Sequence, residues 1–217
     1  PGNNCGGCGF PGCDGLAAAI AAGTAPVNGC PVGGAPVADK IAAIMGVESG
    51  SSEKKVAFVK CKGTCDKTNV KYNYYGITDC SMVTVAPGSG EKACAYGCMG
   101  YGSCVKACQF DAIHVVDGVA VVDKEKCVAC GKCVATCPKG LIELVPYKAE
   151  HLVQCSSHDK GPAVKKVCTA GCIGCTLCTK QCESDAIHME NNVAVIDYSK
   201  CTNCGKCAAK CPAKVIQ

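Results

Sequence analysis

Cysteine is far more abundant in this chain than in an ordinary globular protein, and its spacing limits what the chain can fold into. The 217 residues include 25 Cys, only 3 Phe and no Trp. Large apolar side chains are too few for a conventional core of this size. The cysteine count is odd, whereas a disulfide framework normally uses an even count, and many thiols fall in closely spaced C-x2-C runs. The pattern indicates metal ligation in a reducing compartment.

The charged residues argue against a nucleotide site. The net charge is +4, and all 22 basic residues are Lys. Arg is the residue best suited to hold phosphate or guanine through paired hydrogen bonds, and the chain has none. Neither of the glycine-rich phosphate-binding patterns, G-x-G-x-x-G after a strand and G-x-x-x-x-G-K-[ST], is present. We therefore expect no nucleic-acid partner and no NAD or ATP site on this chain.

The supplied sequence has no segment long enough to predict a membrane span. Such a span needs about 18 consecutive apolar residues, and the most apolar early stretch, residues 16–22, suits only a short helix. The chain begins at Pro1 without Met, four residues before the first Cys. We therefore expect that a segment upstream of Pro1 is missing.

The second half of the chain contains two copies of one module. Residues 94–141 match residues 168–215 at a constant offset of 74. In each copy an alternating segment around a DG or NN turn predicts a two-stranded hairpin, over 113–123 and over 187–197. Short helical turns are expected after the C-x2-C-x2-C runs. The cysteines of the first copy are Cys94, Cys98, Cys104, Cys108, Cys127, Cys130, Cys133 and Cys137, and those of the second are Cys168, Cys172, Cys178, Cys182, Cys201, Cys204, Cys207 and Cys211.

Outside the hairpins, periodicity and turn residues predict the remaining elements. Residues 16–23 and 37–47 have the apolar spacing of helices. Residues 54–60 and 151–155 are expected to form strands that lead into a cysteine, and residues 81–92 a loop.

The second copy carries the clearest metal-binding spacing. CIGCTLCTKQC and CTNCGKCAAKCP resemble the C-x2-C-x2-C-x3-C runs of bacterial two-cluster ferredoxins, in which the fourth Cys of each run binds the other cluster. Zinc is the alternative, but zinc sites use paired C-x2-C knuckles. By the ferredoxin resemblance the two ligand sets are Cys172, Cys175, Cys178 and Cys211, and Cys182, Cys201, Cys204 and Cys207.

The first copy departs from this pattern at one position. CVACGKCVATCP keeps the ferredoxin spacing, which assigns a cluster to Cys127, Cys130, Cys133 and Cys108. In CMGYGSCVKAC, however, Tyr101 stands where a ligand is expected. Two solutions are open: Cys94 completes a four-iron site, or the site holds a three-iron cluster. The three remaining ferredoxin ligands of this site are Cys98, Cys104 and Cys137.

The N-terminal segment carries a second resemblance. CGGCGFPGC, followed by Cys30, has the spacing C-x2-C-x4-C-x16-C, and CGGCGFPGCDGLAAAI is similar to the cluster segment that follows the membrane anchor in B subunits of Rnf-type, ion-translocating ferredoxin:NAD oxidoreductases. KCKGTC, YYGITDC and ACAYGCMGYGSCVKAC resemble the longer, polyferredoxin-like members of that family, so the resemblance covers most of the chain. By it, one cluster is held by Cys5, Cys8, Cys13 and Cys30.

The middle of the chain leaves one cluster incomplete. Cys61, Cys65 and Cys80 are three expected ligands without a fourth, which must come from Cys94, Cys155 or Cys168. Cys80 and Cys155 take nearly corresponding places before their modules, so Cys155 is either the missing ligand or the remnant of a lost site. Four ligands on each of about six clusters use 24 of the 25 cysteines.

The predicted fold is therefore α+β, with a small helical cluster domain followed by tandem ferredoxin-like modules. The expected domains are an N-terminal cluster domain at 1–50, a joining cluster domain at 51–93, and ferredoxin-like modules at 94–150 and 151–217. No residue is expected to do acid–base or nucleophilic chemistry. His114 and His188 are expected to face solvent on their hairpins rather than to bind a cluster.

The resemblance implies an electron-transfer subunit of a larger oxidoreductase. Electrons from reduced ferredoxin pass along about six [4Fe-4S] clusters, one of which holds either three or four irons, toward the membrane part of a complex that pumps Na+ or H+. The NAD site lies on another subunit. The chain itself is expected at the cytoplasmic side of the cell membrane, held there by the missing N-terminal anchor. The alternatives are a freestanding soluble polyferredoxin, which would lack that anchor, and a zinc protein, which would be colourless.

Overall fold

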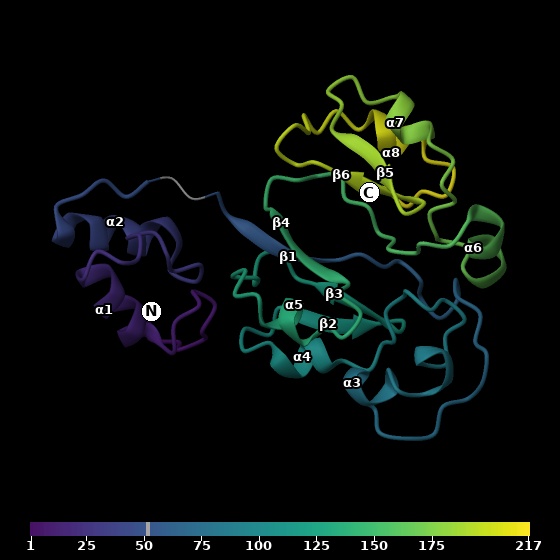
Figure 1. The fold of residues 1–217 in the computed structure, drawn as a ribbon, viewed down its shortest axis with the longest axis horizontal. Helices are drawn as coiled ribbons and strands as arrows, with labels where there is room; N and C mark the ends of the chain where they lie inside the picture. Colours follow the sequence, from purple (N-terminus) through teal and green to yellow (C-terminus); the bar gives the residue numbers. More distant parts are fainter. Residues whose placement is uncertain (51–52) are drawn as a thin grey trace.

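The computed structural model describes residues 1–50 and 53–217. The N-terminal part holds helix α1 (Cys13–Ala21) and helix α2 (Gly34–Met45), the purple pair in Figure 1. Leu16 and Ile20 on α1 are buried, as are Ala38 and Ala42 on α2. These are the two helices predicted for 16–23 and 37–47, each beginning three residues earlier than expected.

Strand β1 (Lys55–Val59) pairs antiparallel with β4 (Ile142–Pro146), which follows the first cysteine module. The expected strand at 54–60 is therefore confirmed. Val56, Ala57 and Val59 on β1 enter the same buried core as the first module. The segment before the module thus packs into the module's core, because its consecutive apolar side chains, residues 56–59, need a partner surface.

The two modules share one local fold. In the first, β2 (Ile113–Val116) pairs with β3 (Val119–Val122), and in the second, β5 (Ile187–Glu190) pairs with β6 (Val193–Ile196). Both predicted hairpins are confirmed, and both turns use residues with positive φ at the tip. A short helix follows each cysteine run. These helices are α4 (Ser103–Ala107), α5 (Lys132–Thr136), α7 (Leu177–Lys180) and α8 (Lys206–Lys210).

Two expectations on the connecting segments need correction. The stretch 81–92 is not a plain loop, because it contains most of helix α3 (Cys80–Val83) and a 3-10 turn at Pro87–Ser89. The stretch 151–155 forms no strand of its own and makes only a single bridge, from Val153 to Ile216. The helix before the second module, α6 (Gly161–Val167), was not predicted.

The mixture of helices and small two-stranded sheets agrees with the expected α+β class. The proposed boundary between residues 50 and 51 lies at the edge of the described residues. Within the described part of the chain, no helix combines the length and the apolar character that crossing a membrane requires.

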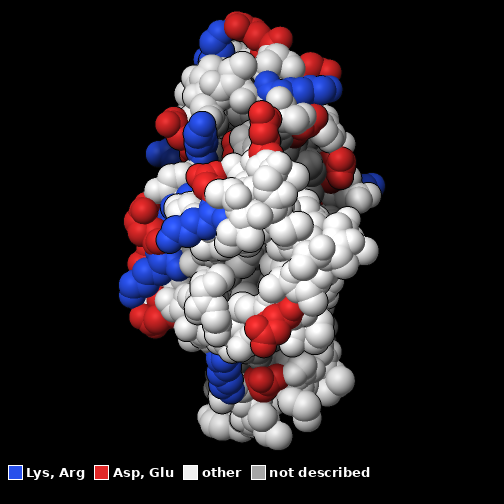
Figure 2. Space-filling view, turned by 90° about the vertical axis from the view of Figure 1, so that its left-hand side faces the viewer, with Lys and Arg blue, Asp and Glu red and all other residues white. Residues whose placement is uncertain are grey.

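Charge is distributed unevenly over the chain. Residues 1–50 contain only four charged side chains, those of Asp14, Asp39, Lys40 and Glu48. Figure 2 views the molecule from the side on which α1 and α2 lie, and much of that face is uncharged. Ile44 and Val47, at the end of α2, are largely exposed. The N-terminal part therefore presents an apolar, charge-poor surface.

Candidate metal centres

One cavity matches the expected ferredoxin site of the first module. It is lined by Cys108, Cys127, Cys130 and Cys133, which we name the Cys130 set. The backbone amide of Ala57 on β1 donates a hydrogen bond to the Cys127 sulfur at 3.3 Å. Amide donors to sulfur are the contacts that tune an iron–sulfur cluster.

The second site of this module differs from the expected one. Its cavity is lined by Cys80, Cys98, Cys104 and Cys137, the Cys80 set, whereas Cys94 lines a different cavity. Sequence analysis offered Cys94 as the fourth ligand or a three-iron cluster. The structure instead brings in Cys80, from the segment between β1 and the module.

A small polar network holds Cys80 in this position. Asp79 caps helix α3 by accepting a hydrogen bond from the Ser81 amide at 3.0 Å. The Cys80 amide donates to the Ser103 hydroxyl at 2.8 Å, and that hydroxyl donates to Asp79 at 3.0 Å. Hydrogen bonds from the Ser81 and Ser103 side chains lower the pKa of Asp79 to about 2. The carboxylate thus stays ionised and fixes the start of α3.

Tyr101 lies beside the Cys80 set as a packing residue. Its ring meets the ring of Tyr74 edge to face, with centroids 5.7 Å apart, and both rings pack against the buried cluster of Cys80, Val83 and Met99. Where the sequence has Tyr101 in place of the expected cysteine, the structure thus has Cys80, from a neighbouring segment, in the wall of the cavity.

The second module keeps the self-contained ferredoxin arrangement. One cavity is lined by Cys172, Cys175, Cys178 and Cys211, the Cys175 set. The other expected ligands are Cys182, Cys201, Cys204 and Cys207, the Cys204 set; three of them, all except Cys204, pack against the core of this module. The Cys182 sulfur accepts a hydrogen bond from the Ala186 amide at 3.2 Å, and the Ser184 hydroxyl lowers its pKa.

Three of the N-terminal cysteines, Cys5, Cys8 and Cys30, lie on the loops before α1 and α2, and Cys13 is the first residue of α1. The Cys13 amide donates to the Asn4 side chain at 2.8 Å, and the Gly33 amide donates to the Cys30 sulfur at 3.3 Å. Gly7, between Cys5 and Cys8, approaches the first module closely: a Cβ there would lie 2.7 Å from the carbonyl oxygen of Cys130. Only glycine allows this approach, which brings the N-terminal cysteine loop against the Cys130 set.

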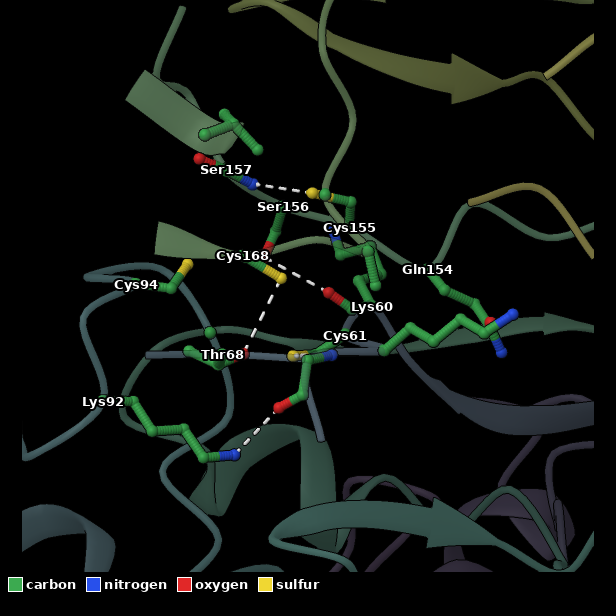
Figure 3. Close-up of a pocket in the computed structure, with 16 residues that line it drawn as sticks. Lys60, Cys61, Thr68, Lys92, Cys94, Gln154, Cys155, Ser156, Ser157 and Cys168 are labelled. Carbon is green, nitrogen blue, oxygen red and sulfur yellow. Dashed lines mark hydrogen bonds between the residues drawn. The ribbon is translucent and has the colours of Figure 1, made fainter. Parts of the chain in front are cut away.

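The three cysteines that the sequence grouped in the middle of the chain are separated. Cys80 joins the first module, as described above. Cys61 lines a cavity together with Cys94, Cys155 and Cys168 (Figure 3). Cys65 is exposed and lines none of the cysteine cavities found among the described residues.

Burial changes the acidity of many of these thiols. It raises the pKa of Cys104 to about 12 and the pKa values of Cys133, Cys155 and Cys178 to about 11. A cysteine binds metal as the thiolate. Such buried thiols are therefore suited to a bound cationic centre that offsets the cost of the buried negative charge.

The cysteine sets can be compared with single-ion sites and with cluster sites. No group of three or more His, Cys, Asp or Glu side chains that could hold a metal ion is found among the residues that the structure describes. The thiolates of a structural zinc site all lie about 2.3 Å from one ion, whereas those of a cubane bind separate irons around a larger body. Four cysteines spread around one cavity, with amide donors on their sulfurs, fit the second arrangement.

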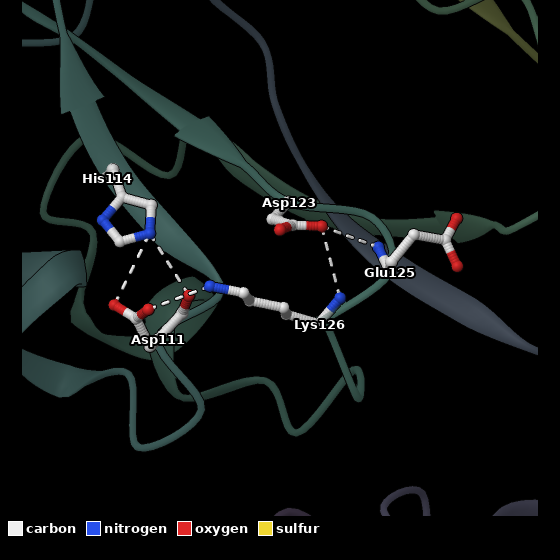
Figure 4. A network of polar contacts seen from close by, with 5 residues as sticks. All are labelled: Asp111, His114, Asp123, Glu125 and Lys126. Carbon is white, nitrogen blue, oxygen red and sulfur yellow. Dashed lines mark hydrogen bonds and ion pairs between the residues drawn. The ribbon is translucent and has the colours of Figure 1, made fainter.

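The histidines of the hairpins point into solvent, as predicted. His114 contacts the Asp111 carboxylate at 3.5 Å, and Lys126 contacts the same carboxylate at 3.0 Å (Figure 4). His188 pairs with Glu190 at 2.9 Å. Both His side chains are about half exposed and engaged with carboxylates on the surface.

Three family models match separate parts of the chain. Residues 1–32 match the FeS family, residues 103–148 the LdpA Fe-S cluster-binding domain, and residues 171–215 the 4Fe-4S dicluster domain. These matches cover the N-terminal cysteines and most of the two modules. The chain is therefore an iron–sulfur protein with [4Fe-4S] domains.

Relatives that match over the whole length of this chain show which family it belongs to. Over all of this chain, the B subunit of the Na+-translocating ferredoxin:NAD+ oxidoreductase complex of Acetobacterium woodii is 52% identical. The B subunit of an ion-translocating oxidoreductase complex of Methanosarcina acetivorans is 47% identical, and the chain covers 82% of it. The chain belongs to the B-subunit family of ion-translocating oxidoreductase (Rnf) complexes. The B subunit of the proton-translocating complex of Clostridium ljungdahlii, 43% identical with 78% of its length covered, is a further relative.

The resemblance to Rnf B subunits stated from the sequence is thereby confirmed. The chain spans 65% of the length of the Acetobacterium relative. Sequence reasoning did not predict that Cys80 lies with the first module. The available signal is Ser103, the residue that accepts the hydrogen bond from the Cys80 amide, because the matching position of the second module is Leu177.

Proposed function

We propose that this chain is the electron-transfer part of an ion-translocating ferredoxin:NAD oxidoreductase, as its family membership suggests. When bound, [4Fe-4S] clusters supply one-electron redox chemistry. The chain's own residues hold the clusters, space them, and donate hydrogen bonds to the ligand sulfurs. We expect NAD to bind another subunit.

Five cysteine sets are the cluster sites that this proposal requires. The cavities of the Cys130, Cys80 and Cys175 sets each have four cysteines in their walls. The Cys204 set completes the second module by its ferredoxin spacing, and the N-terminal set lies within the FeS family match. A sixth cluster, which brings the number to about six, is argued in the next subsection.

The contacts between sets support a path from the N-terminal set through the first module, and this is the observation on which the proposal rests. Gly7 of the N-terminal loop approaches Cys130, so the N-terminal set adjoins the first module. Within the first module the two sets share helices: α4 contains Cys104 and ends just before Cys108, and α5 contains Cys133 and ends just before Cys137. Neighbouring sets are thus held by shared, short elements.

The distribution of charge supports a direction for this path. Residues 151–217 contain eight Lys and five Asp or Glu, whereas residues 1–50 contain one Lys and three acidic side chains. A positively charged module favours association with an acidic ferredoxin. The uncharged face beside α1 and α2 suits contact with other Rnf subunits at the cytoplasmic face of the membrane (Figure 2). We propose that electrons enter at the C-terminal module and leave at the N-terminal part.

The test is anaerobic mixing with a reduced two-cluster ferredoxin. After mixing, the two proteins are separated by size and the reduction state of each is measured by electron paramagnetic resonance. We expect oxidised ferredoxin and reduced chain, and no NADH when NAD+ is present. The metal-free chain is the control. A fully loaded chain that leaves ferredoxin reduced would refute the proposed function.

A further inference from the structure

Four cysteines from separate parts of the chain surround one cavity between the two modules. Cys61 follows β1, Cys94 precedes the first module's cysteine run, Cys155 precedes α6, and Cys168 follows α6 (Figure 3). None of the four lies in the residues matched by the family models, which are 1–32, 103–148 and 171–215.

Cys61 and Cys155 occupy equivalent positions in the two halves of the chain. The Cys61 sulfur accepts a hydrogen bond from the Cys98 amide at 3.3 Å, and the Cys155 sulfur accepts one from the Cys172 amide at 3.3 Å. Cys98 and Cys172 are matched residues of the repeat, 74 positions apart. Each sulfur also accepts from the amide two residues further along its own chain, at 3.4 and 3.5 Å.

The backbone confirms this equivalence. The Lys60 amide donates to the Leu141 carbonyl at 2.8 Å, and the Gln154 amide donates to the Val215 carbonyl at 2.8 Å. Leu141 and Val215 are again 74 positions apart. Cys155 therefore corresponds to Cys61, and the correspondence with Cys80 that the sequence suggested is replaced.

The other two cysteines complete a symmetric arrangement. Cys94 and Cys168 are themselves matched residues at the offset of 74. Each half of the chain thus contributes one cysteine from the segment before its module and one from just ahead of its first ferredoxin ligand. The segment 67–69 joins the halves directly, because the Asn69 amide donates to the Val167 carbonyl at 3.0 Å and the Thr169 amide to the Lys67 carbonyl at 2.8 Å.

Buried polar groups around the cavity are arranged for a negatively charged occupant. The Thr68 hydroxyl, 5% exposed, donates to the Cys168 sulfur at 3.7 Å. Lys92 is 8% exposed and lines the same cavity. Its ammonium donates to the carbonyl oxygen of Gly63 at 3.0 Å (Figure 3) and to that of Gly118 at 2.6 Å. A buried ammonium on neutral carbonyls is costly unless an anionic group lies nearby, and a cubane on four thiolates is anionic.

We propose that Cys61, Cys94, Cys155 and Cys168 form a [4Fe-4S] site that bridges the two modules, with Lys92 as its charge partner. The inference rests on the proposed electron-transfer function. The bridging site adjoins the Cys80 set through the Cys98 amide and the Cys175 set through the Cys172 amide. It therefore supplies the connection without which the two modules would be separate pairs of clusters.

The first test is the iron and sulfide content of the Cys168→Ala chain, purified anaerobically. We expect a loss of about four irons and four sulfides per chain relative to the wild type, if the whole cluster is lost, with the circular dichroism of the folded protein retained. Cys65→Ala is the matched control and should lose none. Unchanged iron and sulfide in a folded Cys168→Ala chain, or an equal loss in Cys65→Ala, would overturn the proposal.

The second test keeps all four thiols, so it does not require a chain that lacks one of these cysteines to fold. Lys92→Met removes the buried ammonium, and we expect about one sixth of the redox-active absorbance to titrate at a lower potential. Lys71→Met is the control, because Lys71 is exposed and its ammonium donates to the Gly88 carbonyl at 3.1 Å. An unchanged titration of Lys92→Met would overturn the proposal. If ferredoxin fails to reduce the wild-type chain, that result refutes the proposed function but not the bridging site.

Discussion

The two modules share a sequence pattern but complete one of their sites in different ways. In the second module, Cys175 lies within the same short run as Cys172 and Cys178. In the first, the matching position is Tyr101, and Cys80 lines the cavity from another segment. A cavity lined by four cysteines is therefore built either from two segments of the chain or, where Cys80 takes part, from three.

The difference traces to the length of one connection. Cys61 and Cys94 are 33 positions apart, whereas their equivalents Cys155 and Cys168 are 13 apart. The longer connection carries helix α3 and thereby Cys80. The cavity of the first module thus gains a cysteine from an insertion, and its composition depends on the folding of that insertion.

Removal of the metal should have the largest effect on folding, and the two modules should differ in how much structure they keep. Chelation of all iron is expected to leave most of the chain disordered, since the thiolate sets organise both modules. The first module also has the β1–β4 sheet and a larger buried core, so its backbone should keep more protection. Hydrogen exchange of the apo chain, followed by mass spectrometry, measures this. Native-like circular dichroism after complete chelation would contradict the prediction.

The next largest effect is expected from the ligand that differs. Cys80→Ala should lower the iron content by about one to four per chain, with a three-iron signal in electron paramagnetic resonance if the cluster survives. Cys175→Ala should do the same in the second module. The double variant Cys80→Ala with Tyr101→Cys tests the comparison directly, because it recreates the run of the second module. Restored four-iron content is expected, and a full iron content in Cys80→Ala alone would show that Cys80 is not a ligand.

A smaller effect is expected from the hydroxyl that positions Cys80. Ser103→Ala leaves the Cys80 amide without its acceptor and removes a donor to Asp79, a loss of about 1–3 kcal/mol for a buried donor. Iron should leave the variant faster in the presence of a chelator, while the starting iron content stays near that of the wild type. The matched control is Leu177→Ala at the corresponding position of the second module. Equal rates of iron loss from both variants would show that Ser103 does not position Cys80.

Much of this site could be predicted from local spacing. The hairpins follow from their turn residues, and the sets around Cys130 and Cys175 follow from runs that hold three of the four cysteines, with the fourth assigned by the ferredoxin resemblance. The first two helices followed from apolar periodicity. The Cys80 and bridging sites could not be predicted, because their ligands come from segments separated by tens of residues. The matching hydrogen bonds to the Cys61 and Cys155 sulfurs and the backbone bonds at Lys60 and Gln154 show that Cys61, rather than Cys80, is the equivalent of Cys155.

The smallest effect on iron content and potential is expected from the two hairpin histidines, which occupy matching positions in the modules. His114 and His188 are matched residues on the two hairpins, each with its imidazole on a surface carboxylate. Such exposed pairs contribute about 0–1 kcal/mol, and neither ring reaches a cysteine cavity in the part of the chain that the structure describes. His114→Ala and His188→Ala should therefore leave iron content and the redox titration unchanged. An imidazole ligand raises a cluster's potential, so a fall in potential in either variant would mean that this histidine, and not a cysteine, completes a set in its module.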